Sequence, residues 1–309
     1  FNALGLNLTV NNNATLTVTT NNDLTITDWI NINSTGDLIL QNSSSLIQVN
    51  NTTNQGTMHM TRTANIRKLD YVYWSSPLTN ASLATTFAGW RLDYAFQFVT
   101  PNFEDLLTIN NLGVVTAATS DTFDDYAPWA WQPYTGVMTP GKGYAIMAPT
   151  TGTFPRMETR TFTGVGNLNK FNNGIITVPL ALSANATVTT DDYNLVGNPY
   201  PSAINADLFL AANSSVIKGT VYLWTHNTAF ANNVYTSNDY AVYNLLGGVG
   251  TSSAVNSGIN NAKPNGKIAS GQAFFVKGIN GGGNAVFNNS MRIVGQNASF
   301  FKSNGIQNT

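Results

Sequence analysis

The chain has 309 residues, of which 42% are hydrophobic, so it can bury a sizeable core in one large domain or two ordinary ones. Only 9% of its residues are charged and the net charge is −1 without a basic stripe, which argues against nucleic acid as a partner. No apolar run approaches the roughly 20 residues that span a bilayer, so no transmembrane segment is expected.

Residues 1–62 are predicted to form a short parallel β-helix, a β-solenoid. Leu16 precedes Leu38 by 22 residues, Leu24 precedes Leu46 by 22, and Leu6 precedes Ile30 by 24. Three strands in about 22 residues, with Asn-rich corners, are typical of one solenoid turn. A meander of ordinary hairpins is the alternative. The inward apolar pairs are expected at Leu6/Leu8, Leu16/Val18, Leu24/Ile26, Ile30/Ile32, Leu38/Leu40 and Leu46/Val49.

The start of this solenoid is predicted to be an open edge. Phe1 stands at the beginning of a turn and is neither an initiator Met nor part of a signal peptide, so we interpret the chain as a processed or truncated piece of a longer precursor. Solenoids need caps, and uncapped strand edges pair with other chains. The expected partners are therefore copies of the chain itself or the rest of a larger surface protein.

Residues 63–309 are predicted to form a β-sandwich-like domain, with a further division near residues 185–192 as an alternative. Clusters of aromatic and β-branched residues bounded by Gly, Pro, Asn or Ser are typical of strands. Ala203 to Ala212 is expected to be a helix capped by Ser202, and a second short helix is expected at Phe103 to Leu107. The strand clusters are centred on Tyr71-Val72-Tyr73-Trp74, Tyr94 to Phe98, Ala145 to Met147, Val221 to Trp224 and Ala273 to Val276.

Five phrases occur in order in this second part: Tyr73-Trp74-Ser75-Ser76-Pro77, Pro140-Gly141-Lys142-Gly143-Tyr144, Gly197-Asn198-Pro199-Tyr200-Pro201-Ser202, Ala269-Ser270-Gly271-Gln272-Ala273-Phe274-Phe275-Val276 and Phe287-Asn288-Asn289-Ser290-Met291-Arg292. Together they resemble the region that precedes the C-terminal sorting signal in large cell-surface proteins of Bacteroidota, which the type IX secretion system exports. The resemblance covers roughly residues 65–309 and implies a secreted, extracellular protein of the outer cell surface, often an adhesin. It implies no catalytic residues.

Reactive side chains are scarce. The chain has two histidines, His59 and His226, which are far apart in the sequence, and it has no cysteine, so neither a nucleophile–base pair nor a zinc site is expected. Solenoids do host polysaccharide-cleaving enzymes, but this repeat offers only Asp23, Asp28 and Asp37. We expect no enzyme activity and no cofactor, with Ca²⁺ as the one ion that loop acids could hold, at Asp121, Asp124, Asp125, Asp191 and Asp192.

An aromatic segment is the one ligand-binding candidate. Trp129 and Trp131 would share one face of a strand near Tyr134, either as a platform for surface glycans or as part of the core. The favoured function is a non-catalytic structural or adhesive component of the bacterial outer surface, as the base of a large adhesin or as a self-assembling filament subunit. A glycan-binding module or a polysaccharide-active β-helix enzyme is the alternative.

Overall fold

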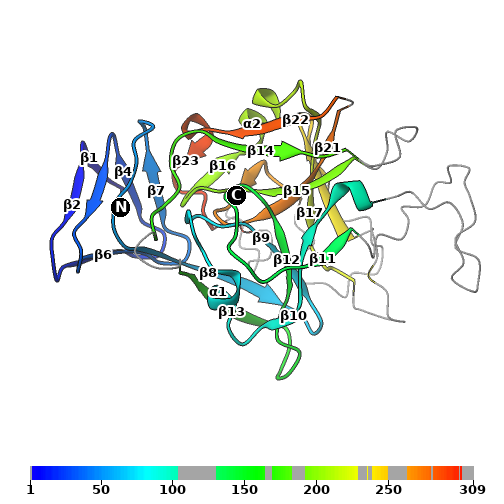
Figure 1. Cartoon of the computed structure of the whole chain (residues 1–309), viewed down its shortest axis with the longest axis horizontal. Coiled ribbons are helices and arrows are strands. Elements are labelled where there is room, and N and C mark those ends of the chain that lie inside the picture. Colours follow the sequence, from blue (N-terminus) through cyan, green and yellow to red (C-terminus); the bar gives the residue numbers. More distant parts are fainter. Residues whose placement is uncertain are drawn as a thin grey trace, which may run out of the picture.

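The chain folds as an all-β protein in which short strands carry nearly all of the regular structure (Figure 1). The computed structural model describes residues 2–103, 130–163, 169–182, 192–228, 235, 239–249, 263–279, 281–298 and 300. The abundance of Thr, Val, Ile and aromatic residues explains the class, because these side chains suit a pleated, half-buried surface.

The first seven strands pair in parallel with strands about 22 residues away. β1 pairs with β4 and β4 with β7, β2 pairs with β5, and β3 pairs with β6. The register joins Leu8 to Ile30, Leu16 to Leu38 and Leu24 to Leu46. The bounds are β1 (Asn2–Gly5), β2 (Leu8–Val10), β3 (Thr15–Val18), β4 (Asp23–Ile26), β5 (Ile30–Ile32), β6 (Asp37–Leu40) and β7 (Ser45–Gln48).

Four of the six expected apolar pairs coincide with strands, and two do not. Leu6 is 67% exposed and lies before β2, so the inward pair of that strand is Leu8 and Val10. Val49 is 55% exposed, and the inward residue beside Leu46 is the buried Gln48. Gln48 exchanges two 2.7 Å hydrogen bonds with the side chain of Asn54, which satisfies both buried amides.

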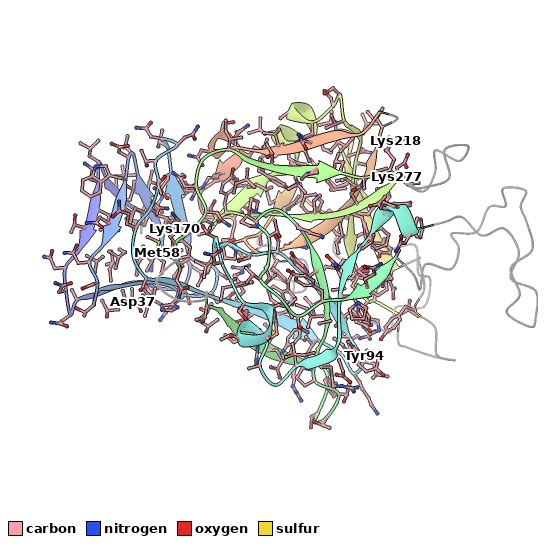
Figure 2. All side chains as sticks on the ribbon, in the orientation of Figure 1. Asp37, Met58, Tyr94, Lys170, Lys218 and Lys277 are labelled. Atoms are coloured by element: carbon pink, nitrogen blue, oxygen red, sulfur yellow. The ribbon has the colours of Figure 1, made fainter. Side chains whose placement is uncertain are left out.

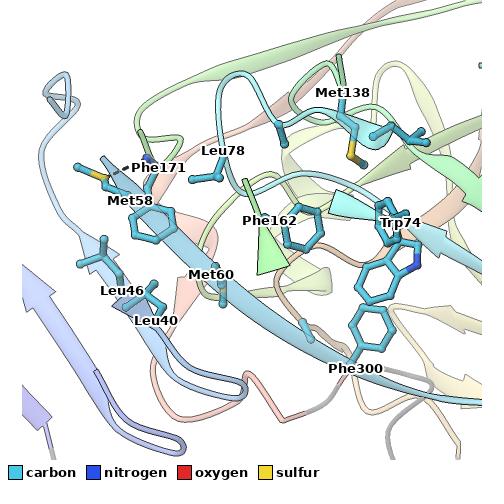
Figure 3. Packing of buried hydrophobic residues seen from close by; sticks show 14 of the residues in the cluster. Leu40, Leu46, Met58, Met60, Trp74, Leu78, Met138, Phe162, Phe171 and Phe300 are labelled. Carbon is cyan, nitrogen blue, oxygen red and sulfur yellow. Dashed lines mark hydrogen bonds between the residues drawn. The ribbon is translucent and has the colours of Figure 1, made fainter. Parts of the chain in front are cut away.

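Strand β8 (Met58–Ile66) connects the parallel strands to the rest of the chain. Its first residues, Met58 to Met60, pair in parallel with β6, and Met60 to Ile66 pair antiparallel with β13 (Arg156–Phe162). One apolar cluster therefore runs from Leu40 and Met60 to Trp74 without interruption (Figure 3). The expected boundary at residue 62 falls inside β8, and the division into two domains stays a prediction.

Two antiparallel sheets form the centre of the remaining chain. One has the order β11-β10-β12-β9 and the other β15-β21-β17-β18-β19. The five aromatic segments expected as strands lie in these sheets. The bounds are β9 (Tyr71–Trp74), β10 (Arg91–Phe98), β11 (Trp131–Pro133), β12 (Tyr144–Met147), β15 (Tyr193–Gly197), β17 (Ile217–Trp224), β18 (Tyr240–Asn244), β19 (Gly247–Val249) and β21 (Ala273–Gly278).

An aromatic cluster fills the space between these two sheets. Tyr73 of β9 and Phe98 of β10 meet Phe275 of β21 at centroid distances of 5.8 and 4.8 Å, and Trp224 of β17 stacks on Tyr73. Strand periodicity explains the arrangement, since alternate residues of each strand point to opposite faces. Val72 and Trp74 thus enter the cluster shared with β8.

Short elements complete the fold. The remaining strands are β14 (Ile176–Leu180), which pairs with β22 (Gly283–Phe287), and β16 (Ala203–Asn205), which lies between β20 (Lys267–Ile268) and β23 (Arg292–Ile293). The helices are α1 (Leu83–Thr86), α2 (Ala206–Ala212) and the 3-10 turns η1 (Thr100–Asn102) and η3 (Asn289–Met291). Across the described ranges no helix has the length and apolar character to cross a membrane.

The expected helix at residues 203–212 is shorter than predicted. Ala203 to Asn205 is a strand, and the N-cap is Asn205 rather than Ser202, because the Asn205 side chain accepts a 2.8 Å hydrogen bond from the backbone of Asp207. The C-terminal end at Asn213 is as expected. The other expected helix, after Phe103, lies outside the described residues.

Four of the five resembling phrases meet at one junction. The backbone of Ser75 bonds to Gly271, Gly197 to Gly141, and Asn198 to Gln272, at 2.7–3.0 Å. A Cβ atom at Gly197 would come within 2.5 Å of the Cβ of Ser75, so only glycine permits this approach. The phrases therefore have a structural role in joining the sheets.

Candidate functional site

The edge formed by β1, β2 and β3 is the candidate functional surface. Each of these strands is the last in its sheet, with a single paired neighbour among the described strands. In Figure 1 they lie at the end of the molecule away from the two central sheets. Such an edge leaves backbone N–H and C=O groups available to another strand.

Apolar side chains at this edge are less buried than their counterparts one strand further in. Ala3, Leu8 and Leu16 are partly buried, whereas Ile30 and Leu38 are 1% and 0% exposed. Leu4, which points outward, is 81% exposed. Because the inward side chains repeat in register, one more layer of strands would cover Leu8 and Leu16 as these cover Ile30 and Leu38.

Polar corners repeat along the same direction. The Asn33 side chain donates to Asn11 at 3.4 Å, and the backbone of Asn13 donates to the Thr35 hydroxyl at 3.0 Å. Asn21 and Ser43, at equivalent corners, both have positive φ values of 62° and 66°. The edge thus presents corners of the same chemistry that it uses to hold the layer beneath it.

The opposite end of the parallel strands is covered by the rest of the chain. The backbone N–H of Leu46 donates to Pro201 at 2.8 Å, and its carbonyl accepts from Arg292 at 2.5 Å. The Asn173 side chain donates to the carbonyls of Asn50 and Thr52. One end of the parallel stack is therefore open and the other is closed.

The aromatic candidates lie in two different clusters. The Trp131 ring packs between the central sheets, 5.0 Å from Phe98 and 5.9 Å from Phe275, measured between centroids. Tyr134 belongs to the other cluster, where it stacks on Tyr144 at 5.1 Å. Trp129 lies outside the described residues. Trp131 and Tyr134 do not form one platform, and glycan binding at this segment stays a prediction.

The acidic candidates do not gather into a cation site in the described ranges. Asp121, Asp124, Asp125 and Asp191 lie outside them, and Asp192 is buried, with its carbonyl accepting from Gly278 at 2.8 Å. Within these ranges no group of three His, Asp or Glu side chains is placed to hold a metal ion. Calcium binding stays a prediction.

The three acids of the repeat also have separate surroundings. Asp23 accepts a 3.3 Å bond from Gly295, the carbonyl of Asp28 accepts from Thr52, and Asp37 lies 3.6 Å from His59. The pKa of Asp37 is raised because the side chain is partly buried, and the nearby His59 opposes this shift in part. In Figure 2 Asp37 lies on the parallel strands, at the opposite end of the molecule from Lys277.

The second histidine has a partner that sequence analysis missed. His226 lies at a strand end, as expected, and its Nδ1 is 2.8 Å from Asp70, with both side chains 1% exposed. The residues are 156 positions apart, so no local pattern indicates the pair. The His226 ring stacks on Trp224, which places the pair beside the aromatic cluster.

Two buried arginines were also missed. Arg292 spans the joint between the parallel strands and the central part of the chain, and Arg62 lies in the middle of β8. Arg62 carried a local signal, because it occupies an inward position in the alternation of Met58, Met60 and Ala64. A charge at an inward position of a strand needs a partner or a ligand.

Comparisons with known proteins give one match. No curated protein and no solved structure matches the chain. A family model described as "Domain of unknown function (DUF8693)" matches residues 1–309. Because that model spans the whole sequence, the chain belongs to the DUF8693 family.

Proposed function

We propose that this chain is a non-catalytic structural or adhesive component of the outer surface of a bacterium of the Bacteroidota, exported by the type IX secretion system. In this proposal the parallel strands are the end of a β-helix, the two central sheets form a sandwich-like body, and a further coil extends the helix at β1, β2 and β3. The single observation that carries the proposal is the open edge, where Leu8 and Leu16 are partly buried at inward positions.

The occupant that suits this edge is another coil of about 22 residues. It would need small aliphatic side chains over Leu8 and Leu16 and Asn or Thr at its corners, because each described layer holds the next through these groups. Head-to-tail joining of two copies through their coil ends needs both ends of the parallel strands to be open. Because the end at Leu46 is closed, we favour a coil from a larger surface protein. The filament form needs a second complementary surface elsewhere.

A fusion tests the open edge. One copy of residues 23–44 is placed before residue 1, and amide hydrogen exchange is measured in β1, β2 and β3. We expect exchange there to slow by at least about tenfold, because the edge amides and the inward leucines become covered. The control fusion has the same length with Ser at the inward positions Leu24, Ile26, Ile30, Ile32, Leu38 and Leu40. Equal exchange in both fusions would contradict the proposal.

The unfused chain tests the filament form. Sedimentation velocity over a range of concentrations detects self-association, and Leu16→Lys, at the inward position, is compared with Thr17→Lys, at the exposed neighbour on the same strand. If Leu16→Lys abolishes association and Thr17→Lys does not, the result would support a second copy at the edge. A monomer at all concentrations would favour a coil supplied by a larger protein.

Antibody labelling of intact producer cells tests the location. We expect the antigen to be reached without lysis and to disappear from the surface when type IX export is disabled. Labelling that requires lysis would contradict the surface proposal, and turnover of a polysaccharide by the purified chain would favour the enzyme alternative.

A further inference from the structure

Two arginines face each other on the inner side of β8 and β13. Arg62 is the direct register partner of Arg160 in this antiparallel pair. Side chains directly opposite one another share a face, with Cβ atoms roughly 5 Å apart, and like charges in that position repel. Arg62 is 1% exposed, so its charge has almost no contact with water.

The charge around this pair is unbalanced. Among the described residues Glu158 is the one carboxylate bonded to this pair, and it is shared between Arg156 at 2.8 Å and Arg160 at 3.0 Å. Three guanidiniums and one carboxylate leave a charge of +2 (3 − 1) in the cluster. Burial, with no carboxylate to oppose it, lowers the pKa of the Arg62 guanidinium to about 9.

Hydrogen-bond donors also outnumber acceptors here. Arg62 donates one bond, from Nη2 to the carbonyl of Asn297 at 2.8 Å. Within the described ranges, its Nε and Nη1 and the Nε of Arg160 are buried without an acceptor, as are the indole nitrogens of Trp74 and Trp90. Leaving a buried donor without an acceptor is unfavourable, and more so for a charged group. Each of these five N–H groups can donate a hydrogen bond to an oxygen acceptor.

Ring contacts place these donors in one cluster. The Arg62 guanidinium lies over the ring of Phe300 at 5.4 Å, and that of Arg160 lies over Trp90 at 5.7 Å. Trp74 connects the two, with centroids 4.8 Å from Phe300 and 6.2 Å from Trp90. Figure 3 shows Phe300 beside Trp74 on the inner side of β8.

From this arrangement we propose that Arg62 and Arg160 form a binding site for a small oxyanion, such as a carboxylate or sulfate, on the inner side of β8 and β13. Guanidinium forks bind such groups through charge-assisted bonds to two oxygens. An anion placed between the two arginines reduces their repulsion and accepts from the Nε atoms of both, which have no acceptor in the described part of the chain.

The side of β13 is the part of the site that is nearest to solvent. That strand is the last in the order β13-β8-β6-β3, and the side chains of Arg156 and Arg160 are 29% and 21% exposed. Arg62 lies deeper, behind Asn297 and Phe300. A small anion can therefore arrive through Arg160, whereas a large ligand is excluded from Arg62.

Calorimetric titration of the full chain tests the site. Sodium sulfate, sodium acetate and sodium glucuronate are titrated at constant ionic strength made up with chloride, which separates inorganic anions from the carboxylates of organic and sugar acids. We expect saturable binding of at least one of them. Arg160→Gln should weaken it at least about tenfold, because a charge-assisted bond is lost. Arg62→Met should abolish it.

Arg91→Gln is the matched control. Arg91 pairs with Asp93 on the exposed surface at 2.6 Å, so this variant has the same change in net charge at a different place. Wild-type affinity in Arg91→Gln with weak binding in Arg160→Gln supports the site. Equal affinities in the two variants, or no saturable binding of any of the three anions, would overturn it. Arg160→Lys, which keeps the charge but not the fork, replaces Arg160→Gln if circular dichroism shows that the latter is unfolded.

Discussion

Arg62 and Arg292 are two buried arginines in similar surroundings with different hydrogen bonding. Each guanidinium lies over an aromatic ring, Phe300 for Arg62 and Tyr200 for Arg292, and burial lowers the pKa of each to about 9. The Arg292 Nε donates to Ser202, Nη1 to Asn173, and Nη2 to the carbonyl of Leu46. In the described part of the chain, Arg62 donates to a single acceptor, the carbonyl of Asn297.

This difference separates a structural arginine from a candidate binding arginine. Arg292 connects segments that are 246 residues apart, and each of its nitrogens has an oxygen partner. A buried charge is tolerated when its donors are met, so Arg292 needs nothing further. Arg62 is also buried, and two of its nitrogens have no acceptor among the described residues, which is why the binding proposal concerns Arg62 and not Arg292.

The largest expected effect is that of Arg292→Met. The substitution leaves acceptors at Leu46, Asn173 and Ser202 without their donor and opens the joint between the parallel strands and the rest of the chain. We expect the free energy of unfolding to fall by about 3–5 kcal/mol, measured by urea denaturation. The free energy of unfolding of Arg292→Lys should lie between the values of wild type and Arg292→Met. A loss below about 1 kcal/mol would show that the hydrogen-bond network is not what holds this joint.

The matched substitution Arg62→Met should have a much smaller effect in chloride buffer. It removes one hydrogen bond and relieves the desolvation of an unbalanced charge, and methionine fills a similar volume. We expect the free energy of unfolding to change by less than about 1 kcal/mol in either direction. If Arg62→Met costs as much as Arg292→Met, then Arg62 is structural and the contrast between the two arginines fails.

The sequence predicts the repeating parts of this fold better than its joints. Leu16/Val18 recurs 22 residues later as Leu38/Leu40, and this short-range pattern was sufficient to place strands β3 and β6. Leu6 was misplaced because an apolar residue next to a strand cannot be distinguished from an inward one by alternation alone. Gln48 was missed because its burial depends on Asn54, a partner in a loop.

The candidate site could be predicted only in part for the same reason. The open edge of the parallel strands follows from the period, which is local. Arg62 and Arg160 are 98 residues apart (160 − 62), and their pairing depends on how β8 meets β13. Asp70 and His226 are 156 residues apart, and their pairing depends on how β9 meets β17. Strand order of this kind has no signal within a short window of sequence.

The smallest expected effect concerns the aromatic cluster beside these joints, at Tyr71. Burial is the main cause that raises the pKa of Tyr71 from 10.0 to about 12. Between pH 10 and 12 the folded chain therefore keeps the proton of the Tyr71 hydroxyl, whereas the unfolded chain releases it. The stability that Tyr71 contributes is complete below pH 10 and is lost as the pH rises towards 12. Tyr71→Phe retains the ring contacts with Phe96 and Tyr235 but removes the titrating group. We expect a shallower fall of unfolding free energy over this range, measured by urea denaturation at several pH values.

Phe96→Leu is the control, because it disturbs the same packing without removing a titrating group. It should lower the free energy of unfolding at every pH and leave its slope against pH as in wild type. An unchanged slope in Tyr71→Phe would mean that the Tyr71 hydroxyl is not held in the folded state as described.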